Sequence, residues 1–173
     1  MLFRSDRHFA YESWKNFDAT AYLTAKEKAL NCQKTDRKLD FFAFDNDPFA
    51  IKLCNRHALR ANVSQKIRFE VKDIRDFSVM QTGGTIVTNP PYGERLLDLT
   101  QAQGLTRILG QKYAQLSDWS LFVLNADVNF EKSLGKKADK KRKLFNAQKE
   151  CNLYQYFKQS NIKKRFTDLK EFL

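Results

Sequence analysis

Three short segments rich in apolar side chains, each followed by an acidic or amide residue, constrain the fold of this chain most. They are residues 41–44 with Asp45, residues 67–71 with Asp73, and residues 85–88 with Asn89. A run of large apolar residues that stops abruptly at polar ones is typical of a buried parallel strand. The sequence therefore predicts three strands whose carboxyl ends carry polar groups.

Helical patterns alternate with these strands. Asp47 and Pro48 suit the N-cap and first position of a helix whose apolar or small side chains recur every three or four residues. Two more helices, at about 21–32 and 105–116, and a fourth strand at 120–124 are predicted. This alternation indicates an α/β fold with a parallel sheet, in which ligands bind at the carboxyl ends of the strands. We expect the three polar strand ends to converge there.

The charge balance favours a polyanionic partner. The 173 residues carry 31 Lys and Arg against 20 Asp and Glu, a formal net charge of +11. Such an excess favours nucleic acid, because basic side chains that neutralise phosphates release counterions. Between Glu131 and Lys149 there are eight basic residues against two acids. From charge alone this stretch is either a solvated loop or hairpin, or a surface that contacts RNA phosphates.

Membrane, metal and disulfide chemistry are not indicated. No apolar stretch approaches the roughly 18 residues needed to span a bilayer, and the first residues lack the apolar core of a signal peptide. Cys32, Cys54 and Cys151 lie far apart without CxxC spacing. We therefore expect a cytoplasmic protein with reduced thiols, no metal and no membrane partner.

The residues Asn89, Pro90, Pro91 and Tyr92 carry the most chemical information. Four specified residues recur by chance at about one position in 10⁵, so a chance match in this chain is improbable. The purely structural interpretation is a rigid Pro-Pro turn between a strand and a helix. The functional interpretation is transfer to the exocyclic amine of a nucleobase. The Asn89 side-chain oxygen and the Pro90 carbonyl would accept hydrogen bonds from that amine and orient its lone pair. Tyr92 would stack on the extracted base.

The segment VTNPPYGERL resembles the amino-methyltransferase signature of class I S-adenosylmethionine enzymes. With FAFDND and FEVKDI upstream and RKLFNAQKECNLYQYF downstream, the chain is similar to the ribosomal RNA guanine methyltransferases that carry an N-terminal THUMP domain. The resemblance runs from about Asp6 to about Phe157. It implies a Rossmann-like, mostly parallel sheet and methylation of the 2-amino group of a guanine in large-subunit RNA.

The resemblance also implies a cofactor site for S-adenosylmethionine. Asp45 would bind the ribose hydroxyls, Asn46 would lie beside the adenine, Asp73 would accept the adenine amino group, and Ile74 would pack on the adenine ring. Two carboxylates and an amide are suitable acceptors for such groups.

For the RNA, the resemblance assigns the target guanine to Asn89, Pro90, Pro91 and Tyr92. It places KLFNA near the target base, and RNA contacts are expected from Lys140, Lys141, Arg142, Lys143 and Asn146.

One departure from the family pattern is a missing glycine-rich segment. Members carry such a segment ahead of Asp45, where backbone N–H groups approach the cofactor, but all six glycines of this chain lie after Asp45. We therefore expect residues 1–173 to be a catalytic domain from the C-terminal part of a longer enzyme, without the first strand of the fold. Weak binding of S-adenosylmethionine is the corresponding expectation.

Two alternatives stay open from the sequence. An adenine amino-methyltransferase acting on DNA or RNA could use the same four residues, since both bases present an exocyclic amine. A catalytically silent remnant could bind RNA through the basic C-terminal half.

Overall fold

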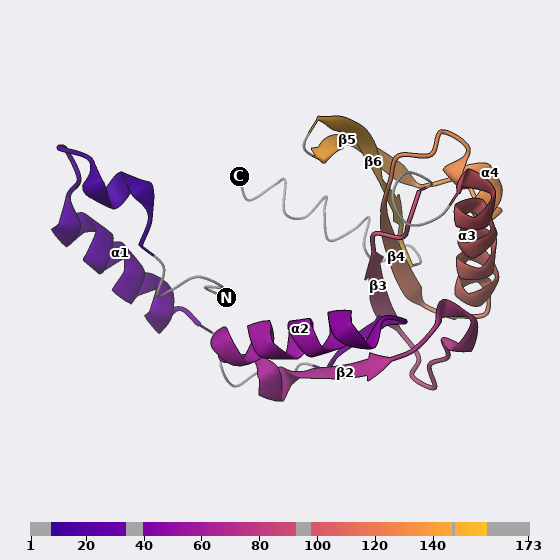
Figure 1. Ribbon diagram of the computed structural model, residues 1–173, viewed down its shortest axis with the longest axis horizontal. Coiled ribbons are helices and arrows are strands. Elements are labelled where there is room, and N and C mark those ends of the chain that lie inside the picture. Colours follow the sequence, from indigo (N-terminus) through magenta and orange to yellow (C-terminus); the bar gives the residue numbers. More distant parts are fainter. Residues whose placement is uncertain (1–7, 34–39, 93–97, 147, 159–173) are drawn as a thin grey trace. The chain divides into compact units, whose positions relative to one another are not determined.

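The computed structural model describes residues 8–33, 40–92, 98–146 and 148–158. Its Cα positions group into two compact units, residues 1–73 and 74–173, and each unit is described by itself. The first contains the 3-10 helix η1 (Ala10–Ser13), α1 (Ala19–Asn31), β1 (Phe41–Asp45), α2 (Pro48–Arg60), η2 (Ser64–Lys66) and β2 (Ile67–Val71). The second contains η3 (Ile74–Asp76), β3 (Gly84–Thr88), α3 (Leu99–Ala114), β4 (Trp119–Asn125), α4 (Phe130–Leu134), β5 (Lys140–Asn146) and β6 (Lys149–Tyr156) (Figure 1).

In the first unit, β1, α2 and β2 form a parallel strand–helix–strand motif. Strands β1 and β2 pair in parallel, with Phe41 opposite Ile67. Helix α2 contacts both strands and lies alongside β2 (Figure 1). It buries Ile51 and Ala58, which are seven residues apart and therefore on one helical face. The predicted strand, turn and helix are confirmed.

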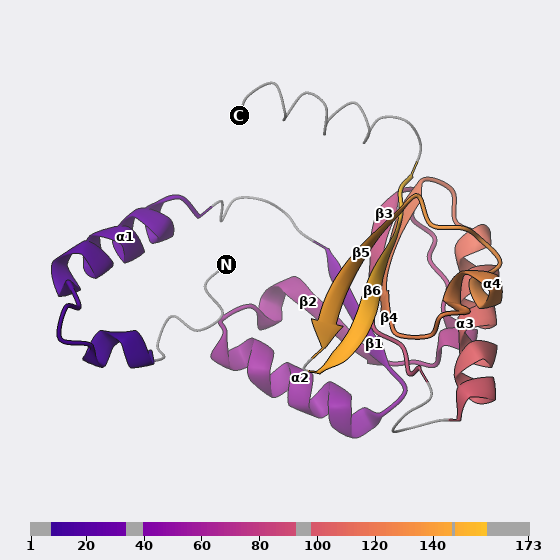
Figure 2. The same ribbon diagram turned by 90° about the horizontal axis from the view of Figure 1, so that it is seen from above.

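In the second unit, four strands form one sheet in the order β3-β4-β6-β5. The β3–β4 pair is parallel, as predicted, whereas β6 pairs antiparallel with both β4 and β5. The basic stretch is thus a β-hairpin at the edge of the sheet, which confirms the hairpin alternative for its backbone. Helices α3 and α4 lie together on one face of the sheet (Figures 1 and 2).

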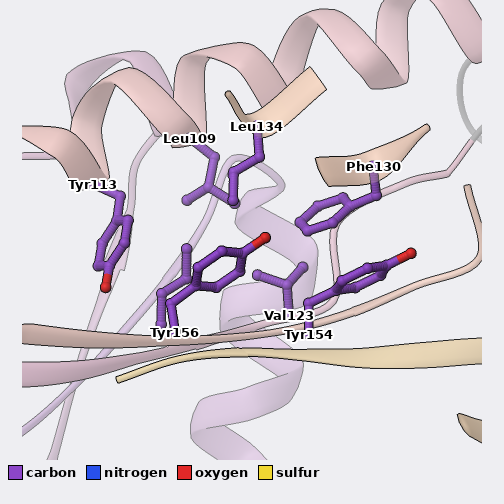
Figure 3. Close-up of a cluster of buried hydrophobic side chains, with 8 residues drawn as sticks. Leu109, Tyr113, Val123, Phe130, Leu134, Tyr154 and Tyr156 are labelled. Atoms are coloured by element: carbon purple, nitrogen blue, oxygen red, sulfur yellow. The ribbon is translucent and has the colours of Figure 1, made fainter. Parts of the chain in front are cut away.

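The core of this unit lies between the two helices and the two middle strands (Figure 3). Its buried side chains are Leu109 and Tyr113 from α3, Leu121 and Val123 from β4, Phe130 and Leu134 from α4, and Tyr154 and Tyr156 from β6. Burying this apolar area is the main stabilising contribution, at about 25 cal/mol per Å².

Three of the buried side chains are tyrosines, and each hydroxyl donates a hydrogen bond to a backbone carbonyl. The acceptors are Trp119 for Tyr113 at 2.9 Å, Lys136 for Tyr156 at 3.1 Å, and Asp127 for Tyr154 at 3.4 Å. Burial raises the pKa of all three phenols. The tyrosines therefore fill the core without leaving a polar atom unsatisfied.

Helix α4 approaches α3 closely at Gly110. A Cβ added at Gly110 would overlap the carbonyl oxygen of Leu134, at the end of α4. Gly104 lies in the same helix, and a Cβ there would meet nothing within 4 Å. The two glycines thus share a helix but differ in what a methyl group would contact.

We predict opposite effects for Gly110→Ala and Gly104→Ala on the free energy of unfolding. Gly104→Ala should raise it by about 0.5–1 kcal/mol, because alanine loses less backbone entropy in a helix. Gly110→Ala should lower it by about 1–3 kcal/mol, because α4 must shift to admit the methyl group. Urea denaturation followed by circular dichroism measures both, and equal stabilisation would show that α4 is not held against α3.

Candidate functional site

A turn after β1 fixes the carboxylate of Asp45. Its Oδ1 accepts a hydrogen bond from the Asp47 backbone N–H at 2.9 Å. The Asp47 carboxylate in turn accepts one from the Phe49 N–H at 2.8 Å and caps α2. This arrangement is a short Asx-type turn followed by an N-cap, as the residue types favour. The Asp45 carboxylate is exposed, and a hydrogen bond within its own turn orients it.

Asp73 lies at the same edge of the β1–β2 sheet. Asp45 is opposite Val71, and the Lys72 backbone N–H donates to the Asp45 carbonyl at 2.9 Å. Asp73 follows Lys72 directly and is half-buried. Asp45, Asn46 and Asp73 are therefore brought to one carboxyl edge, as expected from parallel strands.

Ile74, the fourth residue assigned to the cofactor, begins the second unit. Its side chain is half-buried and packs against the core cluster of that unit. Because Asn89 also belongs to the second unit, the convergence of Asp45 and Asp73 with Asn89 stays a prediction.

Asn89 follows the last residue of β3, at the carboxyl edge that β3 shares with β4. Its side chain is exposed, whereas Pro90, Pro91 and Tyr92 are half-buried. The predicted strand end is confirmed.

Asn125 and Asp127 form a second polar group at this edge, which the sequence pattern did not single out. The Asn125 side chain is buried at the end of β4, and its Oδ1 accepts from the Asp127 N–H at 2.8 Å. The Asp127 carboxylate accepts from the Asn129 N–H and from Gln103 Nε2 of α3, each at 2.9 Å. Both of its oxygens are thus used to hold the loop after β4. The sequence signal that could have found Asn125 is a polar residue at the end of a strand, as in the three strands singled out from the sequence.

The tip of the β5–β6 hairpin contacts Tyr92. Asn146 Nδ2 donates a hydrogen bond to the Tyr92 hydroxyl at 3.2 Å. Lys149 Nζ lies 5.1 Å from the centroid of the Tyr92 ring. The structure therefore brings Asn146, an expected RNA contact, to an expected base-binding residue 54 positions away in the sequence.

The basic side chains of β5 divide between the two faces of the strand. Lys141 and Lys143 lie on one face, opposite Tyr154 and Asn152 of β6. Lys141 Nζ lies 2.8 Å from a Glu131 carboxylate oxygen, and Lys143 Nζ lies 2.6 Å from a Glu150 oxygen. Each of these two lysines is therefore paired with an acid.

Lys140 and Arg142 project from the other face, because successive side chains of a strand alternate. Both are exposed, and within the described part of the chain neither forms an ion pair. Among the described residues, no carboxylate therefore lies within ion-pair distance of either charge.

Glu131 anchors the hairpin to α4. One carboxylate oxygen accepts from Lys141 and the other from the Ala138 backbone N–H at 2.7 Å. Both hydrogen bonds lower the pKa of Glu131, and the one from Lys141 has the larger effect. The same contact raises the pKa of Lys141. Both shifts favour the ion pair.

The described ranges contain neither a clustered set of potential metal ligands nor a membrane span. No group of three or more His, Cys, Asp or Glu side chains there is placed to hold a metal ion. No described helix is long and apolar enough to cross a bilayer.

The family described as "RMKL-like, methyltransferase domain" matches residues 3–155. The chain belongs to this family. The match spans both compact units and includes every predicted site residue.

Three similar proteins illustrate the family. The ribosomal RNA large subunit methyltransferase K/L of Shewanella frigidimarina (strain NCIMB 400) is 33% identical over 91% of this chain and 23% of its own. The crystal structure of SMU.472 complexed with SAH has a TM-score of 0.81 and 34% identity, covering 90% of this chain and 41% of that one. A structure from Listeria monocytogenes str. 4b F2365, described as a predicted N6-adenine-specific DNA methylase, has a TM-score of 0.77 and 33% identity, covering 88% and 39%.

These likenesses confirm the Rossmann-like class I methyltransferase fold. The chain spans less than half the length of each of the three proteins.

The Glu131 anchor predicts a dependence of stability on pH. A carboxyl whose folded-state pKa is lowered contributes stability above its unfolded pKa, and that contribution is lost as the pH falls through the folded value. Glu131→Gln should therefore lower the urea midpoint at pH 7. The difference from the wild type should begin to shrink as the pH falls below about 4.3, the ordinary pKa of glutamate, and should disappear once the pH is below the lowered folded-state pKa. Glu150→Gln is the control, because Glu150 and Lys143 are both more than half exposed and such pairs contribute little. A midpoint difference for Glu131→Gln that persists in acid would contradict the anchor.

Proposed function

We propose that this chain carries the site that transfers a methyl group from S-adenosylmethionine to the exocyclic 2-amino group of a guanine in ribosomal RNA. The observation that carries the proposal is the loop from Asn89 to Tyr92, which follows β3 at a carboxyl edge and is contacted by the tip of a basic hairpin. The relative named for ribosomal RNA methylation supports the substrate class.

The residues at the β1–β2 edge fit the proposed cofactor. Asp45 presents a carboxylate held by its turn, and Asn46 and Asp73 add polar groups at the same edge. Carboxylate and amide oxygens accept hydrogen bonds from ribose hydroxyls and from an adenine amine. The likeness to a structure that holds SAH supports this assignment.

The chemistry at Asn89 concerns a weakly nucleophilic amine. The nitrogen lone pair of the guanine amino group is delocalised into the ring, so acceptors on both N–H groups favour the geometry in which it points at the methyl carbon. The Asn89 side-chain oxygen and the Pro90 carbonyl supply these acceptors, and neither proline offers a competing N–H.

S-adenosylmethionine, which Asp45, Asn46 and Asp73 would hold, would supply an electrophilic methyl group and leave as the neutral thioether. The nitrogen becomes positively charged on methylation and then loses one proton to water. No strong base is needed before transfer, and the site has only to orient the amine and stabilise its developing charge.

Both compact units are proposed to belong to one catalytic domain, because the family match runs across them. We infer a cytoplasmic activity, because the proposed substrate is ribosomal RNA.

An adenine amino-methyltransferase is the second candidate, because one of the similar structures is described in those terms. Incubation with radiolabelled S-adenosylmethionine and RNA, followed by mass spectrometry of the nucleosides, separates the two. The proposal requires N2-methylguanosine. N6-methyladenosine would support the second candidate, and RNA binding without methyl transfer would indicate a silent remnant.

The proposed base-binding loop at Asn89 and the proposed cofactor site at Asp45 predict different effects of substitution. One should change turnover and the other the affinity for the cofactor. Asn89→Ala should reduce turnover about 10²- to 10³-fold with nearly unchanged affinity for S-adenosylmethionine, because one preorganised acceptor is removed. Asp45→Ala should weaken cofactor binding with less effect on turnover at saturation. The assay uses millimolar cofactor, since we expect weak binding without a glycine-rich segment, and calorimetry supplies the affinities. The reverse division would show that the two halves are wrongly assigned.

The division of charge on β5 predicts which basic residues contact RNA phosphates. Lys140→Gln and Arg142→Gln should weaken binding to all RNA sequences alike and flatten the dependence of log K on log salt by about 0.7–0.9 for each phosphate that is no longer neutralised. Lys141→Gln and Lys143→Gln should leave that slope nearly unchanged, because their charges are offset by Glu131 and Glu150. Fluorescence anisotropy over a range of salt concentrations measures the slopes, and four equal slopes would contradict the division.

A further inference from the structure

Tyr92 is contacted from two directions by the end of the β5–β6 hairpin. Asn146 is the last residue of β5 and Lys149 the first of β6, and the two are opposite each other in the antiparallel ladder. Asn146 contacts the hydroxyl, and the Lys149 ammonium group lies over the ring. One ring therefore receives a hydrogen bond at its edge and a cation at one face.

These two contacts restrict different motions of the ring. A hydrogen bond to the hydroxyl limits where the end of the side chain can move, and a cation over the π-face limits rotation of the ring plane. Tyr92 is half-buried, and among the described residues no other aromatic ring stacks on it. The Lys149 ammonium group therefore lies over one face of Tyr92, and no described aromatic ring stacks on the opposite face.

We propose that Asn146 and Lys149 are positioning residues that hold the Tyr92 ring so that the target base stacks on the face opposite Lys149. This inference rests on the proposed function and deepens it, because it names the residues that orient the base-binding surface. A base stacked on a ring of fixed orientation presents its exocyclic amine in one direction, which methyl transfer requires. Asn146 thereby acts through Tyr92 and contacts no phosphate in this role.

A different role for Lys149 is neutralisation of an RNA phosphate, and the two roles make different predictions. If Lys149 neutralises a phosphate, Lys149→Gln flattens the salt dependence by about 0.7–0.9 and weakens binding for every sequence. If Lys149 positions Tyr92, the same substitution leaves the salt slope nearly unchanged and reduces stacking of the base.

The contacts themselves are tested by NMR of the chain with labelled lysine side chains. The ε-methylene protons of Lys149 should resonate upfield of those of the exposed Lys132, because Lys149 lies over an aromatic ring. The upfield shift should persist in Tyr92→Phe and vanish in Tyr92→Leu. An ordinary Lys149 resonance in the wild type would overturn the proposal, whatever the enzyme methylates.

Stacking is tested with a single-stranded oligouridine that carries one 2-aminopurine, a fluorescent base with the same 2-amino group. Stacking on Tyr92 should quench its fluorescence, and Tyr92→Leu should abolish the quenching. Asn146→Ala and Tyr92→Phe should each weaken the quenched complex about two- to tenfold, because each removes the same hydrogen bond. The double variant should be no weaker than either single one, and additive effects would contradict the shared hydrogen bond.

Charge variants complete the experiment. Lys149→Gln should weaken the quenched complex about two- to fivefold, Lys149→Arg should restore it, and Lys132→Gln should leave it unchanged. Weaker quenching in Lys149→Gln together with a flattened salt slope would assign Lys149 to phosphate and overturn its positioning role. A wild-type chain with the NMR shift but no quenching would overturn stacking on Tyr92. Methylation of guanine under the same conditions would then show that the proposed function stands without it.

Discussion

The antiparallel pairing of β6 with β4 is the interaction on which the second unit depends. This pairing places Tyr154 and Tyr156 beside Leu121 and Val123 in one buried layer. Each phenol also needs an acceptor for its hydroxyl, because an unpaired buried hydroxyl is strongly unfavourable. Apolar packing and hydrogen bonding together therefore select one register for β6. Since β5 is an edge strand of this sheet and pairs with β6, the same register decides where the hairpin tip lies.

Charge on the hairpin is organised by the two-residue period of a strand. Lys141 and Lys143 lie on the same face of the sheet as Tyr154, which is the face toward the helices. On this face Glu131 and Glu150 offset the charges of the two lysines. The other face keeps Lys140 and Arg142 exposed. A single strand thus combines an anchor to α4 with a positively charged surface. The anchor to α4 uses hydrogen bonds to a charged carboxylate, which are stronger than hydrogen bonds between neutral groups. The exposed basic face attracts a polyanion at long range, and such attraction needs no fixed side-chain geometry.

The sequence was most informative where structure is local. The strands ending at Asp45, Asp73 and Asn89 and the helix capped by Asp47 follow from residue order and side-chain type, and the structure confirms them. Long-range features could not be derived in this way. The charge run could not separate Lys141 from Arg142, because that difference depends on which face of β5 meets Glu131. The contact of Asn146 with the Tyr92 hydroxyl depends on a pairing between distant segments.

The hairpin register also links the two proposed parts of RNA recognition. A slip of one residue in β5 would exchange its faces, because side chains alternate along a strand. Lys140 and Arg142 would then turn toward α4, and Asn146 would no longer lie opposite Lys149. The proposed phosphate contacts and the proposed orientation of Tyr92 would be lost together, although no residue had changed. The pairing fixed by the buried tyrosines of β6 is therefore a requirement of the proposed site as well as of the fold, because the residues at the hairpin tip take their positions from it.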